Sequence, residues 1–351
     1  MGMNENLFFV CFLILIISIL LLDLGIFNKK AHKISFKEAI IWTSVWIGLS
    51  FLTFLFIRFY GEMIHGITTM EELLSINAQN MHQLKFDLTA DLESNLQIYR
   101  KHLSLEYLTG YLIEYALSVD NIFVIIMIFV SFGVEEKYYH KVLLWGILGA
   151  IVMRFIFIFL CSALIHKFSW LLAPIGGILL FMAIKMFLQR NKNEKIDIKK
   201  HPVVRFTSKW FHVSDTFYKG RFFIKQNGKR LITPLFIVLL VIEFTDVIFA
   251  FDSVPAIFAI TKDPYIVFFS NIFAILGLRS LFFLLINIMN LFHYLKTGLA
   301  ALLAFIGGKM ICHILFHIDM GILTSLLVIV SILAISIIAS LLFPKAQKTD
   351  K

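Results

Sequence analysis

The sequence predicts an all-α polytopic membrane protein with about nine transmembrane helices. Of the 351 residues, 59% are hydrophobic and only 16% are charged, and the mean hydropathy is +0.86. This composition leaves no room for a sizeable soluble domain. Nine apolar segments are each long enough to cross about 30 Å of hydrocarbon. They cover residues 7–27, 39–59, 105–132, 141–165, 170–188, 234–260, 265–290, 294–316 and 321–343.

The positive charge of the chain lies in one segment and sets the predicted orientation. Residues 189–233 hold twelve Lys and Arg against three Asp and Glu, which accounts for the whole net charge of +9. We therefore place this segment in the cytoplasm, where it could contact protein partners, and we do not expect nucleic-acid binding. The N-terminus and residues 61–104 then lie outside, whereas residues 28–38 and the basic C-terminal tail lie inside.

The first 60 residues form two predicted transmembrane helices. The flank before the first apolar segment, MGMNEN, carries no positive charge, and Asp23 interrupts the segment. We interpret it as a retained helix rather than a cleaved signal peptide. Asp23 either contacts a cation or forms a hydrogen bond between helices. Trp42 and Trp46 are expected to be packing or interfacial residues.

Residues 61–104 form a polar segment that is too short for a domain and could hold one or two surface helices. Three histidines in it could collect a metal ion, but we expect them to be solvated: His65, His82 and His102. The cysteines are far apart in apolar segments and are expected to be small core residues: Cys11, Cys161 and Cys312.

Residues 105–188 and 234–316 form two predicted repeats of three spans each. Asp120-Asn121 corresponds to Asp252-Ser253, 132 residues later. Arg154 corresponds to Arg279, 125 residues later, and residues 168–186 align with 292–310 at an offset of 124. Because three is an odd number, the two repeats cross the membrane in opposite directions. In such inverted repeats the substrate site lies near the membrane midplane. The last span and the tail occupy residues 317–351.

Five carboxylates lie in the middle of predicted spans: Glu114, Asp120, Glu243, Asp246 and Asp252. Each costs roughly 2.5 to 3.5 kcal/mol on insertion scales, which indicates a functional site. Pro255 follows the last of them and frees the backbone carbonyl of Phe251. For the acids to act together, either this helix is broken or several helices converge on the site.

The candidate ligands are all oxygen donors. Asn121, Thr245 and Ser253 accompany the five acids. An all-oxygen set favours hard cations such as Mg²⁺, Ca²⁺ and Mn²⁺ over Zn²⁺ or Cu⁺. Protons could occupy neighbouring carboxylates in the absence of metal, so exchange of protons for metal is a further hypothesis.

The basic residues within the spans allow two interpretations each. Arg154 and Arg279 either bridge acids structurally or balance the charge of the site when it is empty. Lys185 and Lys309 either serve as a ligand or gate, or extend to the interface.

Two further groups of residues lie near the ends of the repeats. Gly176-Gly177 and Gly307-Gly308 are expected to be close-packing positions, because small residues let membrane helices approach each other. His313, His317 and Asp319 could bind metal at the outer rim, but we expect them to be interfacial residues.

Three motifs resemble the TerC/Alx family of bacterial integral membrane proteins: TGYLIEYALSVDNIFV at 109–124, EFTDVIFAFDSVPAIFA at 243–259 and DPYIVFFSNIFAILGLR at 263–279. The resemblance implies a multi-pass protein of the bacterial inner membrane that exports Mn²⁺ and is associated with tellurium resistance. It also implies that the acidic motif residues serve the metal: Glu114, Asp120, Asn121, Glu243, Asp246, Asp252 and Ser253. The chain departs from the family pattern at Tyr115-Ala116, Phe244 and Phe251, which puts substrate preference or pocket size in doubt.

The sequence thus predicts a secondary transporter that moves a divalent cation, expected to be Mn²⁺, by alternating access. The direction of transport follows only from the resemblance. We expect neither a prosthetic group nor enzymatic activity. The alternative is a membrane scaffold that recruits partners through residues 189–233 in a tellurium-resistance or stress-response complex. An intramembrane aspartyl hydrolase is disfavoured, because the chain has no glycine-flanked Asp motif of that kind.

Overall fold

The structure is a computed structural model that describes residues 5–27, 35–82, 84–189, 203–204, 206, 209, 213–214, 220–226, 229–288, 294–316 and 320–343. Its helices are α1 (Glu5–Phe27), α2 (Phe36–Tyr60), α3 (Met70–Gln79), α4 (Leu92–Ser131), α5 (Tyr139–Lys167), α6 (Leu172–Gln189), α8 (Pro234–Phe258), α9 (Pro264–Ile288), α10 (Leu295–Phe316) and α11 (Ile322–Leu342). Short 3₁₀ helices cover Gly61–Ile64, Glu136–Tyr138 and Ser169–Leu171. Two strands, β1 (Phe223–Gln226) and β2 (Lys229–Ile232), pair antiparallel with Phe223 opposite Ile232.

The described helices confirm a multi-pass, helical membrane protein. Six segments are long and apolar enough to cross a membrane, judged by length and composition: Phe36–Ile64, Leu92–Ser131, Glu136–Lys167, Pro234–Phe258, Pro264–Ile286 and Ile322–Leu342. Three shorter apolar helices cover Leu7–Leu20, Ala173–Leu188 and Thr297–His313. Each of the nine predicted spans therefore overlaps an apolar helix.

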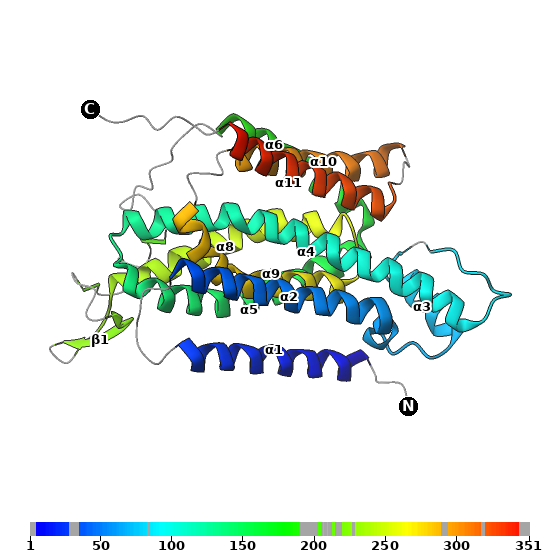
Figure 1. Cartoon of the computed structure of the whole chain (residues 1–351), viewed down its shortest axis with the longest axis horizontal. Coiled ribbons are helices and arrows are strands. Elements are labelled where there is room, and N and C mark those ends of the chain that lie inside the picture. The colour runs from blue at the N-terminus through cyan, green and yellow to red at the C-terminus, as the bar shows by residue number, and fades with distance from the viewer. Residues whose placement is uncertain are drawn as a thin grey trace.

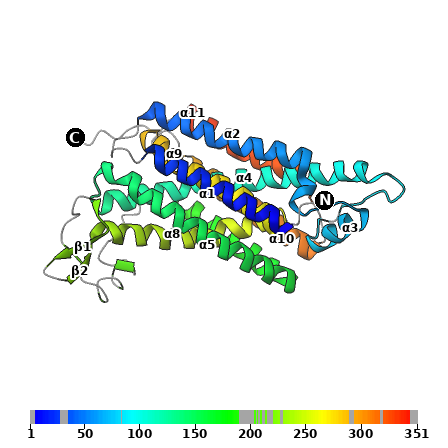
Figure 2. The ribbon, with the colours of Figure 1, turned by 90° about the horizontal axis from the view of Figure 1, so that it is seen from below.

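The two ends of the bundle differ in what they carry. α3 lies at one end and the β1–β2 hairpin lies at the other, which we call the α3 end and the hairpin end (Figures 1 and 2). Figure 1 shows α6, α10 and α11 together along one side of the bundle and α1 along the opposite side, with α4, α8 and α9 between them. The described parts of the predicted outer segment and of the predicted cytoplasmic segment, α3 and the hairpin, are therefore at opposite ends.

Helix α9 is the centre of the core. Within its most apolar window 89% of residues are buried, whereas only 22% are buried in the corresponding windows of α2 and α11. A helix that is buried all round is expected to be mostly apolar, and α9 is so apart from a few buried polar residues such as Asn271 and Arg279. Phenylalanine rings of α1 pack against phenylalanine rings of α9, as in the pair Phe12–Phe269, whose ring centroids lie 4.2 Å apart. α1 is thus attached to the bundle largely through aromatic packing.

Three local predictions differ from the structure. α4 begins at Leu92, 13 residues before the predicted span, because its first turns are polar and invisible to a hydropathy criterion. The hairpin lies in the basic segment, where the sequence predicted no strand. Cys11 was expected in the core but is exposed on α1, whereas Cys161 and Cys312 are partly buried and free.

The helix α8 is not broken at Pro255. It continues to Phe258, so that Pro255 occupies its last turn. A proline there removes one backbone hydrogen bond, and the helix ends within a few residues, so the loss is small. Of the two ways in which the acids could act together, the structure therefore has converging helices.

Glycines allow α6 and α10 to pack closely. A Cβ added to Gly307 would lie 2.9 Å from the carbonyl oxygen of Gly176 and 3.1 Å from the backbone nitrogen of Leu180. By contrast, a Cβ at Gly177 or Gly308 would meet no atom within 4 Å in the described part of the protein. The close-packing prediction is therefore confirmed for one glycine of each pair.

Candidate functional site

A buried arginine joins four helices in the middle of the bundle. Arg154 of α5 is 0% exposed and donates hydrogen bonds through Nη1 to Glu114 Oε1 of α4, to Asn271 Oδ1 of α9 at 2.6 Å and to Ser253 Oγ of α8 at 3.2 Å. Its Nη2 lies 3.4 Å from Asp246 Oδ1 of α8. We call these five residues the central cluster.

Helical spacing explains how α4 and α8 present their polar groups. Glu114 and Asn121 lie seven residues apart on α4, and Asp246 and Ser253 lie seven apart on α8. Seven residues are close to two helical turns, so each pair lies on one face of its helix. Glu114 also accepts a hydrogen bond from Ser118 Oγ at 3.3 Å.

A small cavity adjoins the central cluster. It has a volume of about 30 Å³ and lies between α4, α5, α8 and α9. Its polar lining residues are Asn121, Thr245 and Asp246, and the rest of its lining is apolar side chains and Gly146. Such a volume holds a water molecule or one ion. Within the described residues, Asn121 Nδ2, Asp246 Oδ2 and Glu114 Oε2 are buried without a hydrogen-bond partner. A buried polar atom left unpaired costs about 1–3 kcal/mol, so these atoms indicate a place for a bound species.

The remaining predicted acids are not among the residues that line this cavity. Glu243 is partly buried, and its carboxylate packs on Gly149 of α5, where a Cβ would overlap it. Asp120 is partly buried beside Asn121. The side chain of Asp252 lies outside the description, although its backbone is part of α8.

The predicted charge-balancing residues are placed differently from one another. Arg279 is buried, and its Nη1 lies 3.4 Å from His140 Nε2 of α5. Lys185 is exposed on α6, and Lys309 lines a cavity at the α3 end. The side chain of Asp23 lies outside the description.

Asn271 is a member of the central cluster that the sequence analysis did not single out. It is 0% exposed and lies within the motif at 263–279. A lone amide inside an apolar helix is itself a signal, because a buried polar group requires a partner. Only the fold shows that this partner is Arg154.

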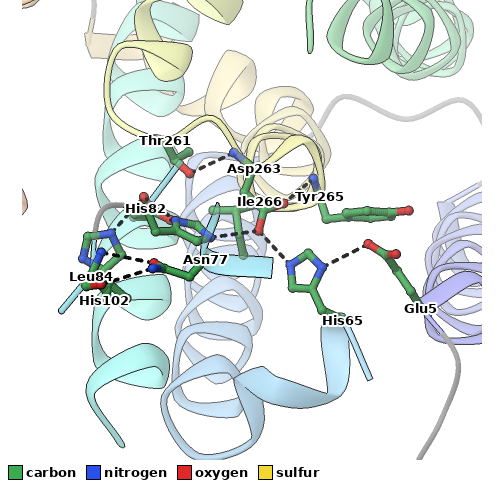
Figure 3. Close-up of polar contacts among 11 residues, drawn as sticks. Glu5, His65, Asn77, His82, Leu84, His102, Thr261, Asp263, Tyr265 and Ile266 are labelled. Carbon is green, nitrogen blue, oxygen red and sulfur yellow. Dashed lines mark hydrogen bonds and ion pairs between the residues drawn. The ribbon is translucent and has the colours of Figure 1, made fainter. Parts of the chain in front are cut away.

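The histidines of residues 61–104 form a second polar cluster at the α3 end, so the prediction that they are solvated is wrong. His65 and His82 are 8% and 7% exposed. His65 lies between two carboxylates, with Nε2 at 2.8 Å from Asp263 Oδ2 and Nδ1 at 3.0 Å from Glu5 Oε1 (Figure 3). His82 Nδ1 lies 3.3 Å from Glu106 Oε2. His317 and Asp319, predicted at the outer rim, lie outside the described residues.

Asp263 connects this cluster to the start of α9. Its Oδ1 accepts a hydrogen bond from the backbone N–H of Tyr265 at 2.9 Å, as an N-cap does. Its other oxygen receives His65. The short connection between α8 and α9 is therefore tied to the segment before α3, and through Glu5 to α1.

Neighbouring carboxylates raise the pKa of both buried histidines. Burial lowers the pKa of His65, but the charge and hydrogen bond of Asp263 and the hydrogen bond of Glu5 outweigh it and raise this pKa to about 9. Burial also lowers the pKa of His82, whereas the charge and hydrogen bond of Glu106 raise it above the usual 6.5. At neutral pH, His65 is thus an imidazolium ion between two carboxylates.

The protonated His65 should make stability depend on pH. Because its pKa is raised on folding, its stabilisation is fully present below pH 6.5 and is lost as pH rises through about 9. A rise from 6.5 to about 9 corresponds to roughly 3 kcal/mol. Thermal unfolding in detergent at pH 6 to 10 should show wild type losing more stability than His65→Gln. Equal pH dependence in the two proteins would contradict this assignment, and His166→Gln serves as the control.

Comparison with known proteins identifies relatives over nearly the whole chain. The model of the integral membrane protein TerC family matches residues 99–348. The uncharacterized membrane protein STKORF319 of Myxococcus xanthus is 39% identical over 339 residues, which are 97% of this chain and 93% of that protein. The putative membrane-bound redox modulator Alx of Escherichia coli strain K12 is 39% identical over 328 residues, 93% of this chain and 92% of Alx. No solved structure matches the chain. The chain therefore belongs to the TerC family of integral membrane proteins.

Proposed function

We propose that this protein is a secondary transporter that moves a hard divalent cation, Mn²⁺, across the membrane through the central cluster. The observation that carries the proposal is that one buried arginine holds Glu114 of α4 and Asp246 of α8, and that Asp246 lines an ion-sized cavity. Two carboxylates from different helices, each with an unpartnered oxygen within the described residues, form a site for a cation with oxygen ligands.

Arg154 acts in this proposal as the counter-charge of the empty site. A buried carboxylate without a cation is strongly unfavourable, so a transporter has to neutralise its ligands when the ion has left. One guanidinium shared by two acids offsets one of their two negative charges, and it leaves one oxygen of each acid available. A divalent cation that enters the cavity replaces the arginine as partner of Glu114 and Asp246.

A purely structural bridge accounts for less of the same geometry. A bridge of this kind is expected to satisfy its acids fully, because an unpaired buried oxygen costs about 1–3 kcal/mol. Here Glu114 Oε2, Asp246 Oδ2 and Arg154 Nε are all buried without a hydrogen-bond partner among the described residues. Glu243 adds a further partly buried acid on the same helix, packed on Gly149.

Two inverted repeats, α4–α6 and α8–α10, form the transport unit in this proposal. Glu114 and Asn121 of α4 each precede their counterparts on α8, Asp246 and Ser253, by 132 residues. The contacts are also paired: α4 packs on α9 and α5 packs on α8, while α6 packs on α10. α1, α2 and α11 complete nine crossings, with the α3 end outside and the hairpin end in the cytoplasm of a bacterial inner membrane. Alternate opening of these two ends would expose the cluster to each side in turn.

The relatives named Alx are described as putative redox modulators, and this chain offers no obvious thiol pair for such a role. All three cysteines are described and free, and they lie on three different helices. An effect of this protein on redox state would then follow from the metal it moves, in the same proposal. Export, rather than import, is carried by the family resemblance alone.

Metal flux into proteoliposomes tests the proposal. Wild type should transport Mn²⁺, and Asp246→Asn should lower the rate roughly tenfold to a hundredfold, because a contact to a charged group contributes about 1.5–3 kcal/mol. The matched control is Glu135→Gln, which neutralises an exposed acid that pairs with Lys137. Equal flux in wild type and Asp246→Asn would exclude the central cluster as the path. Absence of flux in wild type, with cellular activity lost only on removal of the basic segment, would favour the scaffold.

A further inference from the structure

We propose that His82, His102 and Glu106 form a second metal site, at the α3 end, which binds a borderline transition-metal ion such as Zn²⁺. The site is separate from the central cluster and does not depend on the proposed transport. One ligand atom from each residue lies within 4.8 Å of the others. His82 and His102 belong to the segment that the sequence predicted to lie outside, and Glu106 is at the start of the predicted span at 105–132.

The helical backbone fixes two of the three ligands. His102 and Glu106 lie four residues apart on α4 and therefore on one face of it. His102 Nε2 is 3.2 Å from Glu106 Oε1. His82 approaches from the turn after α3, with Nδ1 at 3.3 Å from Glu106 Oε2. Its ring stands at 81° to that of His102, with centroids 5.5 Å apart.

These separations suit a tetrahedral ion. With bonds of about 2.0–2.2 Å, two ligand atoms of a tetrahedral Zn²⁺ site lie about 3.3 Å apart. Measured from one carboxylate oxygen, Glu106 Oε1, the separations are 3.2 Å to His102 Nε2 and 3.4 Å to His82 Nδ1, which lie close to this value without rearrangement of the backbone. Three protein ligands leave a fourth position open for water or another ligand.

Burial and unpaired atoms provide the second line of evidence. The side chains of His82 and Glu106 are 0% and 3% exposed. Yet His82 Nε2 has no hydrogen-bond partner among the described residues, and Glu106 Oε2 has only its ion-pair contact with His82 Nδ1. A nearly dry imidazole and carboxylate whose hydrogen-bonding capacity is only partly used are unfavourable unless a further species binds them.

The surroundings of the site resemble those of known metal centres. When Nδ1 of His82 binds the metal, its Nε2–H is left facing Asp263 Oδ2 at 3.9 Å, as a carboxylate outside the ligand shell does in many zinc sites. All three ligands line a cavity of about 350 Å³ at the α3 end, together with Lys309 and His313. This cavity provides both the entry path and space for the fourth ligand.

The donor set distinguishes this site from the central cluster. Two imidazole nitrogens and one carboxylate favour Zn²⁺, Fe²⁺ or Ni²⁺, and for such a set Zn²⁺ binds more tightly than Mn²⁺. The central cluster offers only oxygens, which favour Mn²⁺. One chain thus has two sites of opposite selectivity, and Glu106 and Glu114 are linked by about 12 Å of the same helix.

Binding of Zn²⁺ to the purified full-length protein in detergent tests this assignment. After chelator treatment and dialysis, wild type should bind one Zn²⁺ per chain, and a hundredfold excess over the dissociation constant should raise the unfolding temperature. His102→Ala should weaken Zn²⁺ binding tenfold or more, whereas His102→Cys, which restores a zinc ligand, should recover much of it. His102 is chosen because its side chain is 20% exposed, so that its removal disturbs the fold less than that of His82.

Two controls separate the outcomes. His166→Ala removes a histidine of α5 that bonds with Ser162 and should leave Zn²⁺ binding unchanged. Asp246→Asn should also leave it unchanged, whatever that variant does to Mn²⁺ flux. Unaltered affinity in His102→Ala, or loss of Zn²⁺ binding in Asp246→Asn, would overturn the proposal, as would failure of wild type to bind Zn²⁺ at all.

Discussion

Replacement of Arg154 with methionine should lower the free energy of unfolding by about 3–5 kcal/mol, which is the usual cost of removing one partner from a buried ion pair. Arg154 is 0% exposed and contacts two carboxylates and two neutral oxygens. Methionine has a similar volume but no charge, so Glu114 and Asp246 would remain buried without a cation. The measurement is chemical or thermal unfolding in detergent, compared with wild type.

Two further variants assign the loss to charge rather than to packing. The double variant Arg154→Met with Glu114→Gln should recover part of the stability, because it removes one of the stranded charges. Lys185→Met, which removes an exposed cation from α6, should change stability by less than about 0.5 kcal/mol. If Arg154→Met were as stable as wild type, Glu114 and Asp246 would not depend on this arginine.

The effect of Mn²⁺ on the stability of Arg154→Met provides a second measurement. In the proposed mechanism the ion replaces Arg154 as the partner of both acids, so Mn²⁺ should stabilise Arg154→Met more than it stabilises wild type. A bridge that is only structural predicts no such difference. Stability with and without Mn²⁺ thus distinguishes the counter-charge from the structural bridge.

The sequence alone predicted the features that depend on composition and helical spacing. Long apolar runs predicted the helices, and carboxylates inside them predicted a functional site, because both signals are local. Glu114 and Asp246 were expected to meet from different helices, and the structure places both on Arg154. Their role as metal ligands stays a prediction.

The histidine cluster could not be predicted in the same way. His65 and Asp263 are 198 residues apart in the chain and 2.8 Å apart in space. Glu106 and Asp263 lie near the ends of predicted spans, where a charged residue is ordinarily solvated and carries no signal. These groups are buried because α3 and its flanking turns pack over the end of the bundle. The hydrophobic periodicity of the sequence does not predict that packing.

The glycines of α6 and α10 provide a prediction in which two neighbouring substitutions differ in sign. Gly307→Ala should destabilise the protein by about 1–3 kcal/mol, the usual cost of overpacking a close contact. The new Cβ would lie 2.9 Å from the Gly176 carbonyl oxygen and 3.1 Å from the Leu180 nitrogen. Both are backbone atoms, so α6 and α10 would have to separate.

Gly308→Ala is the matched control, one residue further along the same helix. A Cβ at Gly308 meets no atom within 4 Å in the described part of the protein. Alanine favours a helix over glycine by about 0.5–1 kcal/mol, so this variant should be as stable as wild type or more stable. Because intrinsic helix propensity is the same for both substitutions, the difference between their unfolding temperatures isolates the contact between α6 and α10. Equal effects of the two substitutions would mean that these helices do not approach at Gly307, and the pairing of α6 with α10 within the proposed repeats would lose its support.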